Sequence, residues 1–234
     1  MKGGSSVKVT TSLIVAILLV LFSSTAVAGQ AVALDENQQE QINCFLSNFS
    51  EVLVQPFARE GISDEELIRF GILHTWWNNR KLITREQGIE RLPTEAVERA
   101  VKKYFGRSLS FHQSSSPGAS YRFDYYEGFY QRSPSFLPDF LGHKFAISVY
   151  FTQVTVFEDE GNGEYTVYGN IYMLEPQTVG PPNLYIPLVK WDARIKEAVR
   201  FVNPIKAIVR QIETDDSSRY ILVEYCYLVT EGKE

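Results

Sequence analysis

The sequence predicts an α+β fold in which N-terminal helices pack on a curved antiparallel sheet built from consecutive hairpins. Apolar residues recur at three- and four-residue spacing in the first half of the chain and alternate with polar residues in the second half. Turn-forming residues separate the alternating stretches. Helices that precede strands in this way are typical of domains with helices on one face of an antiparallel sheet.

The longest hairpin is predicted over residues 145–174, and we take it as the organiser of the fold. Both arms alternate, and residues 158–164 supply the charge and the glycines of a tight reversal. The apolar positions of the first arm change phase part-way along. This change predicts a β-bulge near Thr152 and Gln153, opposite Gly169.

Three helices are predicted ahead of this hairpin. The first spans residues 35–50, where apolar side chains follow a helical period. The second spans residues 63–79 and begins with a capping box formed by Ser63 and Glu66. The third spans residues 93–106, with proline at its start and glycine at its end.

The segments between the helices and the long hairpin are short. Residues 81–92 read largely as a loop, and residues 109–112 as a short strand. Residues 113–118 have the composition of a loop. Aromatic and polar residues alternate over 121–131 around Glu127 and Gly128, which predicts another strand or hairpin.

The last third of the chain follows a crossover over residues 176–187 that is rich in proline. Asp192 is expected to cap a brief helix. A second hairpin is predicted from residues 205–212 and 219–229, which alternate on either side of a polar turn.

Residues 1–28 are predicted to be a signal peptide. Lysines precede a ten-residue apolar run over 13–22, followed by small residues that fit cleavage after Ala28 or after Ala33. Ten residues fall short of the ~20 that a spanning helix needs. We therefore expect one α+β domain over residues 29–234, outside the cytoplasm, either periplasmic or secreted.

The charge of the mature chain restricts its partners. Removing Lys2 and Lys8 leaves 21 basic against 28 acidic residues, a net charge of −7. This balance argues against nucleic acid and against an anionic membrane surface. A small molecule, a peptide or another protein is the expected partner, and the sequence does not indicate an oligomeric state.

Cys44 and Cys226 are the two cysteines of the chain. An even number in an exported protein predicts a disulfide between the first helix and the last strand. The alternative is two free thiols that act as small apolar side chains. A bridge closing so long a loop would stabilise the fold by about 4–5 kcal/mol.

Sequence motifs for metal, cofactor or hydrolase chemistry are missing from the chain. It contains no HExxH, GxGxxG, P-loop or GxSxG motif. Two cysteines cannot form a cysteine-built zinc site. The acidic turn over residues 158–164 lacks the spacing of a calcium loop. The sequence therefore predicts no metal and no cofactor.

A first candidate binding site lies at the end of the second helix. His74 and Trp77 fall on one side of that helix. Trp77 could form the wall of a pocket, and His74 its polar group or an acid or base. The alternative is a helix end that packs in the core, with a hydrogen-bonded histidine.

A second candidate site is the aromatic strand. Tyr121, Phe123 and Tyr125 share one face, which could stack on a sugar ring or a peptide. An ordinary aromatic strand is the alternative. Asp124 and Glu127 form a carboxylate pair that glycoside hydrolysis could use, although carboxylates at this spacing are common.

Three segments carry a resemblance to a family. Residues 65–76, 101–106 and 220–225 resemble a pattern in uncharacterised exported bacterial proteins, a family without an assigned activity. The order of helices and curved sheet is also similar to cone-shaped folds of the NTF2 and cystatin kind. That likeness implies a pocket on the concave side of the sheet.

Two functions follow from these observations. The first is an exported, non-catalytic binding or interaction module. The second is a small extracytoplasmic hydrolase or isomerase whose pocket uses His74 with a carboxylate. A His74 imidazole within hydrogen-bond reach of a carboxylate in a cavity would favour the enzyme, and a His74 enclosed in the core would not.

Overall fold

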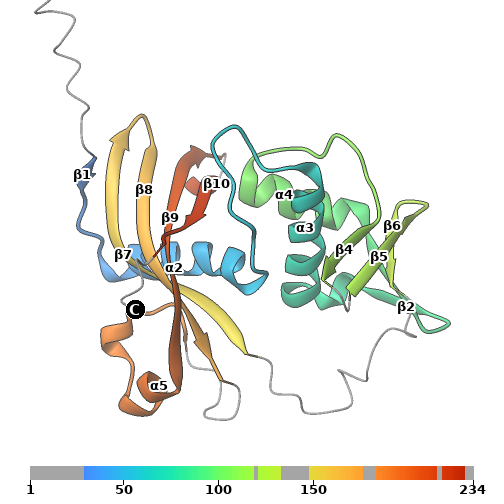
Figure 1. Cartoon of the computed structure of the whole chain (residues 1–234). Helices are drawn as coiled ribbons and strands as arrows, with labels where there is room; N and C mark the ends of the chain where they lie inside the picture. The colour runs from blue at the N-terminus through green and yellow to red at the C-terminus, as the bar shows by residue number, and fades with distance from the viewer. Residues whose placement is uncertain (1–28, 119–120, 133–147, 176–182, 215–217, 230–234) are drawn as a thin grey trace, which may run out of the picture.

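The computed structural model describes residues 29–118, 121–132, 148–175, 183–214 and 218–229. It has the predicted α+β class: helices cover an antiparallel sheet, and a second antiparallel sheet lies at the far side of the helices (Figure 1). The predicted signal peptide, residues 1–28, lies outside the described residues.

The first sheet has the strand order β1-β7-β8-β9-β10, with all neighbours antiparallel. Its strands are β1 (Gln30–Ala31), β7 (Val149–Gly161), β8 (Glu164–Leu174), β9 (Val199–Glu213) and β10 (Ser218–Tyr227). Both predicted hairpins, β7–β8 and β9–β10, are confirmed. Asn162 and Gly163 form the tight turn of the first, with φ of 56° and 74°, which suits asparagine and glycine.

The long hairpin carries the predicted bulge, two residues further along than expected. Val154 pairs with Gly169 and Val156 with Tyr168, so Thr155 is the extra residue. Gly169 lies opposite it, as predicted. A Cβ atom at this glycine would lie 2.9 Å from the Gln153 carbonyl oxygen, which explains why the close approach needs glycine.

The three predicted helices are α2 (Glu36–Glu51), α3 (Asp64–Asn78) and α4 (Thr94–Phe105). Side-chain caps begin the first two: Asp35 accepts a hydrogen bond from the Gln38 amide, and Ser63 from the Glu66 amide. Gly106 ends α4 in the left-handed conformation. Asp192 caps the short helix α5 (Ala193–Ala198), also as predicted.

The second sheet has the order β2-β3-β6-β5-β4. Its strands are β2 (Thr84–Glu86), β3 (Ile89–Pro93), β4 (Ser115–Gly118), β5 (Tyr121–Tyr126) and β6 (Phe129–Arg132). The predicted hairpin over 121–131 is confirmed. The loop predicted over 81–92 is wrong, because that stretch holds the β2–β3 hairpin, and the strand predicted over 109–112 lies instead at β4.

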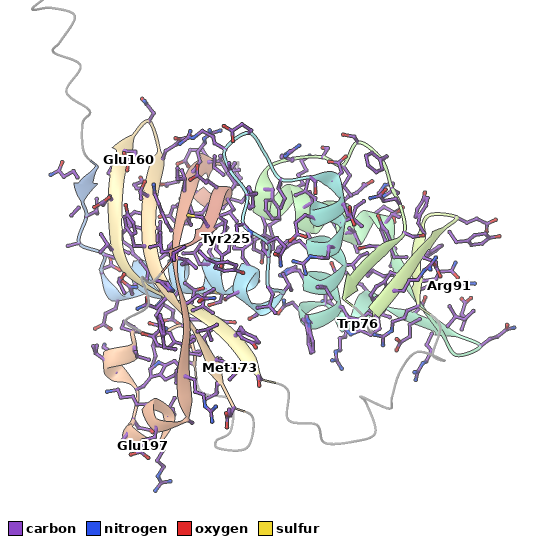
Figure 2. All side chains as sticks on the ribbon, in the orientation of Figure 1. Trp76, Arg91, Glu160, Met173, Glu197 and Tyr225 are labelled. Carbon is purple, nitrogen blue, oxygen red and sulfur yellow. The ribbon has the colours of Figure 1, made fainter. Side chains whose placement is uncertain are left out.

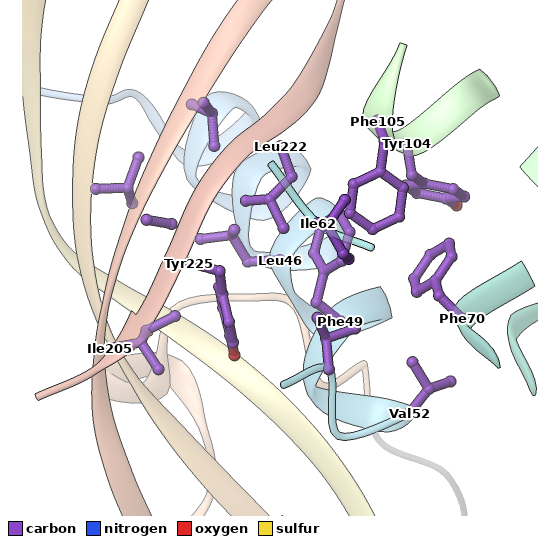
Figure 3. Packing of buried hydrophobic residues seen from close by; sticks show 14 of the residues in the cluster. Leu46, Phe49, Val52, Ile62, Phe70, Tyr104, Phe105, Ile205, Leu222 and Tyr225 are labelled. Carbon is purple, nitrogen blue, oxygen red and sulfur yellow. The ribbon is translucent and has the colours of Figure 1, made fainter. Parts of the chain in front are cut away.

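Helix α3 packs in two cores at once. Leu67 and Phe70 belong to a large core shared with α2, α4 and the first sheet, while Ile68 and Ile72 belong to a core under the second sheet. In Figure 2, Tyr225 marks the large core and Trp76 marks the core under the second sheet. In the large core, Tyr225 and Leu222 of the sheet point toward the aromatic side chains of the helices (Figure 3).

The predicted disulfide is wrong, because Cys44 and Cys226 are both free thiols. Tyr225 packs against Phe49 of α2, with ring centroids 6.4 Å apart. Successive side chains of a strand point to opposite faces, so the neighbouring Cys226 points away from α2, on which Cys44 lies. The sequence could not show this, because it gives the strand but not the face that α2 covers.

None of the helices in the described ranges combines the length and the apolar character needed to cross a membrane.

Candidate ligand-binding pocket

A cavity of about 230 Å³ lies where the ends of α2 and α3 meet the start of β7. Its lining combines one carboxyl group with aromatic and apolar side chains: Glu51, Trp77, Asn78, Ser148, Val149 and Tyr150. Cavities with a few polar groups in an otherwise apolar wall are the usual form of small-molecule sites.

The two helices present their last residues to this cavity. Glu51 is the final residue of α2, and Trp77 and Asn78 end α3. A carboxylate at the C-terminal end of a helix is unfavourable, because the helix dipole places partial negative charge there. The position of Glu51 is therefore not explained by helix stability.

The Glu51 carboxyl is held by neutral hydrogen-bond donors. Asn78 Nδ2 donates to Glu51 Oε2 at 3.4 Å, and the Tyr185 hydroxyl donates to Oε1 at 3.3 Å. None of the ion pairs found among the described residues includes Glu51. Burial raises the pKa of Glu51, and the two hydrogen bonds only partly oppose that effect.

Trp77 supplies the flat wall of the cavity. Its side chain remains 37% exposed at the end of a helix that is otherwise largely buried. The guanidinium of Arg80 lies 5.8 Å from the Trp77 ring centroid, so this ring already contacts a cation. Trp77, predicted as a pocket wall, does line a pocket.

His74 lies behind the pocket, in the core. It is 5% exposed and stacks on Phe70, with ring centroids 5.4 Å apart, while Tyr104 packs edge-on at 4.6 Å. Burial, with a smaller contribution from the positive charge of Lys103, lowers the pKa of His74 to about 4. The imidazole is therefore neutral at physiological pH.

Asn78 separates His74 from the carboxyl group. Its Nδ2 atom lies 3.2 Å from His74 Nδ1 and 3.4 Å from Glu51 Oε2. Within the described ranges, no hydrogen bond joins His74 to a carboxylate, and His74 does not line the cavity. This arrangement fits a core histidine that orients Asn78.

The predicted aromatic face does not join this pocket. Phe123 is 1% exposed and packs against Trp76 in the core under the second sheet. Tyr125 is 38% exposed and stacks on His112, with centroids 5.4 Å apart. Tyr121 pairs with Gly118 in the β4–β5 ladder, and its side chain lies outside what the structure describes.

Asp124 and Glu127 do not form a shared carboxylate site in the described structure. Asp124 accepts a hydrogen bond from Arg122 Nε at 2.8 Å on the exposed face of β5. Glu127 lies in the β5–β6 turn with φ of 46°.

A histidine–carboxylate contact does occur, at His112. Its Nε2 lies 2.8 Å from Glu98 Oε1, and its Nδ1 lies 3.0 Å from the Tyr130 hydroxyl. Both ring nitrogens are therefore engaged, and Tyr130 is fully buried. Neither nitrogen is free to exchange a proton with a substrate, so we assign this contact to packing between α4 and the second sheet.

Sequence reasoning missed Glu51, the central polar group of the pocket. One signal was present: an acidic residue in the last turn of a helix, where the dipole disfavours it. Tyr150 and Val149 were seen only as strand residues. Their proximity to Glu51 depends on how α2 packs on β7, which the sequence does not give.

Among the described residues, no group of three or more His, Cys, Asp or Glu side chains is arranged to hold a metal ion. Comparisons of the chain with protein-family models, with curated proteins and with solved structures find no match. The resemblance to exported bacterial proteins and to cone-shaped folds therefore stays a prediction.

Proposed function

We propose that this protein is an exported binding module, without catalysis of its own, that takes a small organic cation in the pocket at Glu51 and Trp77. One observation carries the proposal. The Glu51 carboxyl is half-buried beside a cavity and accepts hydrogen bonds from Asn78 and Tyr185, but none of the ion pairs among the described residues includes it.

A ligand cation would complete this arrangement. A positive charge beside a buried carboxylate favours its ionised form and offsets the cost of burying it. Aromatic rings attract cations through the negative face of their π-system, and Trp77 and Tyr150 both line the cavity. Val149 adds apolar surface for the body of the ligand.

The alternative, a hydrolase or isomerase that uses His74 with a carboxylate, lacks support from this geometry. His74 is enclosed by Phe70 and Tyr104, and burial keeps it neutral. A general acid or base must reach the proton that it transfers. We therefore prefer binding to catalysis.

The location outside the cytoplasm belongs to the same proposal. It rests on the charged leader, the ten-residue apolar run and the small residues before Gly29. Detection of the protein in the periplasm or the culture medium, with its N-terminus at Gly29 or Leu34, would test this point.

Binding is tested with benzyltrimethylammonium, a permanent cation on a flat ring, by thermal shift and calorimetry at pH 7.5. Neutral benzyl alcohol has the same ring without the positive charge. We expect saturable binding of the cation. Glu51→Gln and Trp77→Ala should each weaken it at least tenfold, about 1.4 kcal/mol.

Glu197→Gln is the matched control, because Glu197 is an exposed glutamate of α5 that does not line the pocket. It should change the affinity less than twofold. Equal binding of the cation and the alcohol, or unchanged affinity in Glu51→Gln, would contradict the proposal.

A further inference from the structure

A second cavity, of about 270 Å³, lies between α2, the end of α4 and the start of β10. Its lining differs from that of the first pocket, since it contains two cationic side chains and three aromatic rings: Gln41, Cys44, Phe45, Asn48, Lys103, Tyr104, Gln211, Ser218, Arg219 and Tyr220. None of these residues lines the pocket at Glu51.

Three aromatic rings form one side of this cavity. Phe45 stacks on Tyr104 with centroids 6.1 Å apart and an angle of 28° between the rings. Phe45 also lies 6.0 Å from the Tyr220 ring. The Tyr104 hydroxyl donates to Asn48 Oδ1 at 3.2 Å, which fixes this ring. Such a surface offers flat apolar area to a ring.

The two cations lack a carboxylate partner in the described part of the chain. No described ion pair includes Lys103 or Arg219. Lys103 Nζ lies 4.9 Å from the Tyr104 ring centroid. Arg219 Nε is buried and has no hydrogen-bond partner among the described residues. Two cationic side chains that line a cavity without an ion-pair partner among the described residues favour an anionic ligand.

The local charge is opposite to that of the whole chain. The protein has a formal net charge of −5. Among the described residues, the ionisable groups that line this cavity are nevertheless Lys103, Arg219, the Tyr104 and Tyr220 hydroxyls and the Cys44 thiol. Burial raises the pKa of Cys44, which keeps the thiol neutral. Glu40 and Glu51 act on Cys44 from a distance, but neither lines the cavity.

We propose that this cavity is a second binding site, for a small ligand that has an anionic carboxylate or phosphate group on a flat aromatic ring. The anion pairs with Lys103 and Arg219, and the ring packs on Phe45 and Tyr220, whose side chains are partly exposed. The cavity volume is near the lower end of the range of ligand pockets, about 300–1,000 Å³, so one ring is the expected size.

Phenyl phosphate and benzoate are the probes, measured by calorimetry at pH 7.5, and their relative affinities distinguish a phosphate from a carboxylate. Inorganic phosphate and phenol each supply one half of the ligand. We expect saturable binding of at least one complete probe, at least tenfold tighter than either half. Affinity should fall as sodium chloride is raised, because the contact is ionic.

Three variants connect this binding to the cavity. Lys103→Gln and Arg219→Gln should each weaken the better probe at least tenfold. Lys102→Gln removes a neighbouring exposed lysine that does not line the cavity and should change the affinity less than twofold. Circular dichroism and the Tm check that each variant is folded.

Cys44 gives a second measurement that does not depend on these variants. In a Cys226→Ser background, Cys44 is the one remaining thiol of the chain. A saturating probe should slow alkylation of Cys44 by iodoacetamide at least fivefold.

The inference would be overturned if neither probe bound saturably, or if inorganic phosphate bound as tightly as phenyl phosphate. It would also be overturned if the Lys103→Gln/Arg219→Gln double variant kept full affinity for the better probe, or if a saturating probe left the rate of Cys44 alkylation unchanged. None of these results bears on the site at Glu51, because the two cavities share no lining residue.

Discussion

Glu90 is buried under the second sheet, Glu51 is half-buried between α2 and β7, and the two carboxyl groups have different hydrogen-bond partners. Glu90 Oε2 accepts a hydrogen bond from Arg132 Nη2 at 2.9 Å, and the Arg132 guanidinium lies 4.1 Å from the Trp76 ring. Among the described residues, the hydrogen-bond donors to the Glu51 carboxyl are the neutral side chains of Asn78 and Tyr185.

This difference separates a structural carboxylate from one available to a ligand. The pair of Glu90 and Arg132 satisfies its charge inside the protein, and both side chains are at most 10% exposed. Glu51 lies beside a cavity without an ion-pair partner among the described residues, and burial raises its pKa. A perturbed pKa in a cavity is more typical of functional sites than of packing.

The largest expected effect on stability is at the ion pair between Glu90 and Arg132. Arg132→Met leaves Glu90 buried beside Arg85, which is 3.6 Å away and more exposed. Removing one partner of a buried ion pair costs about 3–5 kcal/mol, and we expect a loss of this size in the free energy of unfolding, measured with urea.

The control for this change is Arg122→Met. Arg122 pairs with Asp124 at 2.8 Å, and both side chains are more than half exposed. Exposed pairs contribute about 0–1 kcal/mol. Similar losses in the two variants would mean that the Glu90–Arg132 pair is not a structural anchor.

The next effect is acid sensitivity through His74. Its pKa is about 4 in the folded protein against 6.5 ordinarily, so the unfolded chain binds the proton first. The contribution of neutral His74 to the free energy of unfolding should therefore be fully present above pH 6.5 and be lost as the pH drops toward 4. The loss is on the order of 3 kcal/mol, since one pKa unit corresponds to about 1.4 kcal/mol.

The variant His74→Phe should remove this part of the pH dependence. The measurement is the free energy of unfolding at several pH values between 7 and 4, for the wild type and the variant. Parallel curves for the two proteins would show that His74 titrates normally and is not enclosed.

The smallest effect has the opposite sign and belongs to Glu51. A raised pKa means that the folded state holds this proton more tightly than the unfolded chain. The wild type therefore loses stability as the pH rises from the ordinary pKa of 4.5 through the raised value. Glu51→Gln lacks this loss.

We expect the Tm of Glu51→Gln to exceed that of the wild type by a few degrees at pH 8 and to match it at pH 4. Differential scanning calorimetry at the two pH values measures this difference. A variant that is less stable than the wild type at pH 8 would indicate that Glu51 is a stabilising structural residue.

The sequence predicted the first sheet better than the second because its strands are long. In β7 and β8, alternation continues long enough to specify the pairing, and the bulge opposite Gly169 was visible as a change of phase. All three residues of β2 are exposed, so that strand has no apolar pattern to detect. Its pairing with β3 depends on the turn at Gln87 and Gly88, both at positive φ.

Helix α3 shows a second limit of sequence reasoning. Its apolar residues form two faces, since Phe70 and Ile72 pack in different cores. A helix covered on two sides has little amphipathic contrast. Gly71 marks the close contact with α4: a Cβ atom there would lie 2.6 Å from Val97 Cγ1.

The candidate site was only partly predictable for the same reason. Trp77 was identified because it falls on the same side of the second helix as His74. Glu51 lies 26 positions earlier in the chain and comes near it only through packing. The disulfide was predicted from the even number of cysteines, and that number does not show on which face of β10 Cys226 lies.

The most direct test of the central claim is an NMR titration of the Glu51 side-chain carboxyl carbon, with and without benzyltrimethylammonium. We predict a pKa above the ordinary value of 4.5 in the free protein, which falls when the cation binds. A pKa at or below 4.5, or one that the cation does not change, would contradict the claim that Glu51 is a half-buried carboxyl that binds a positively charged ligand.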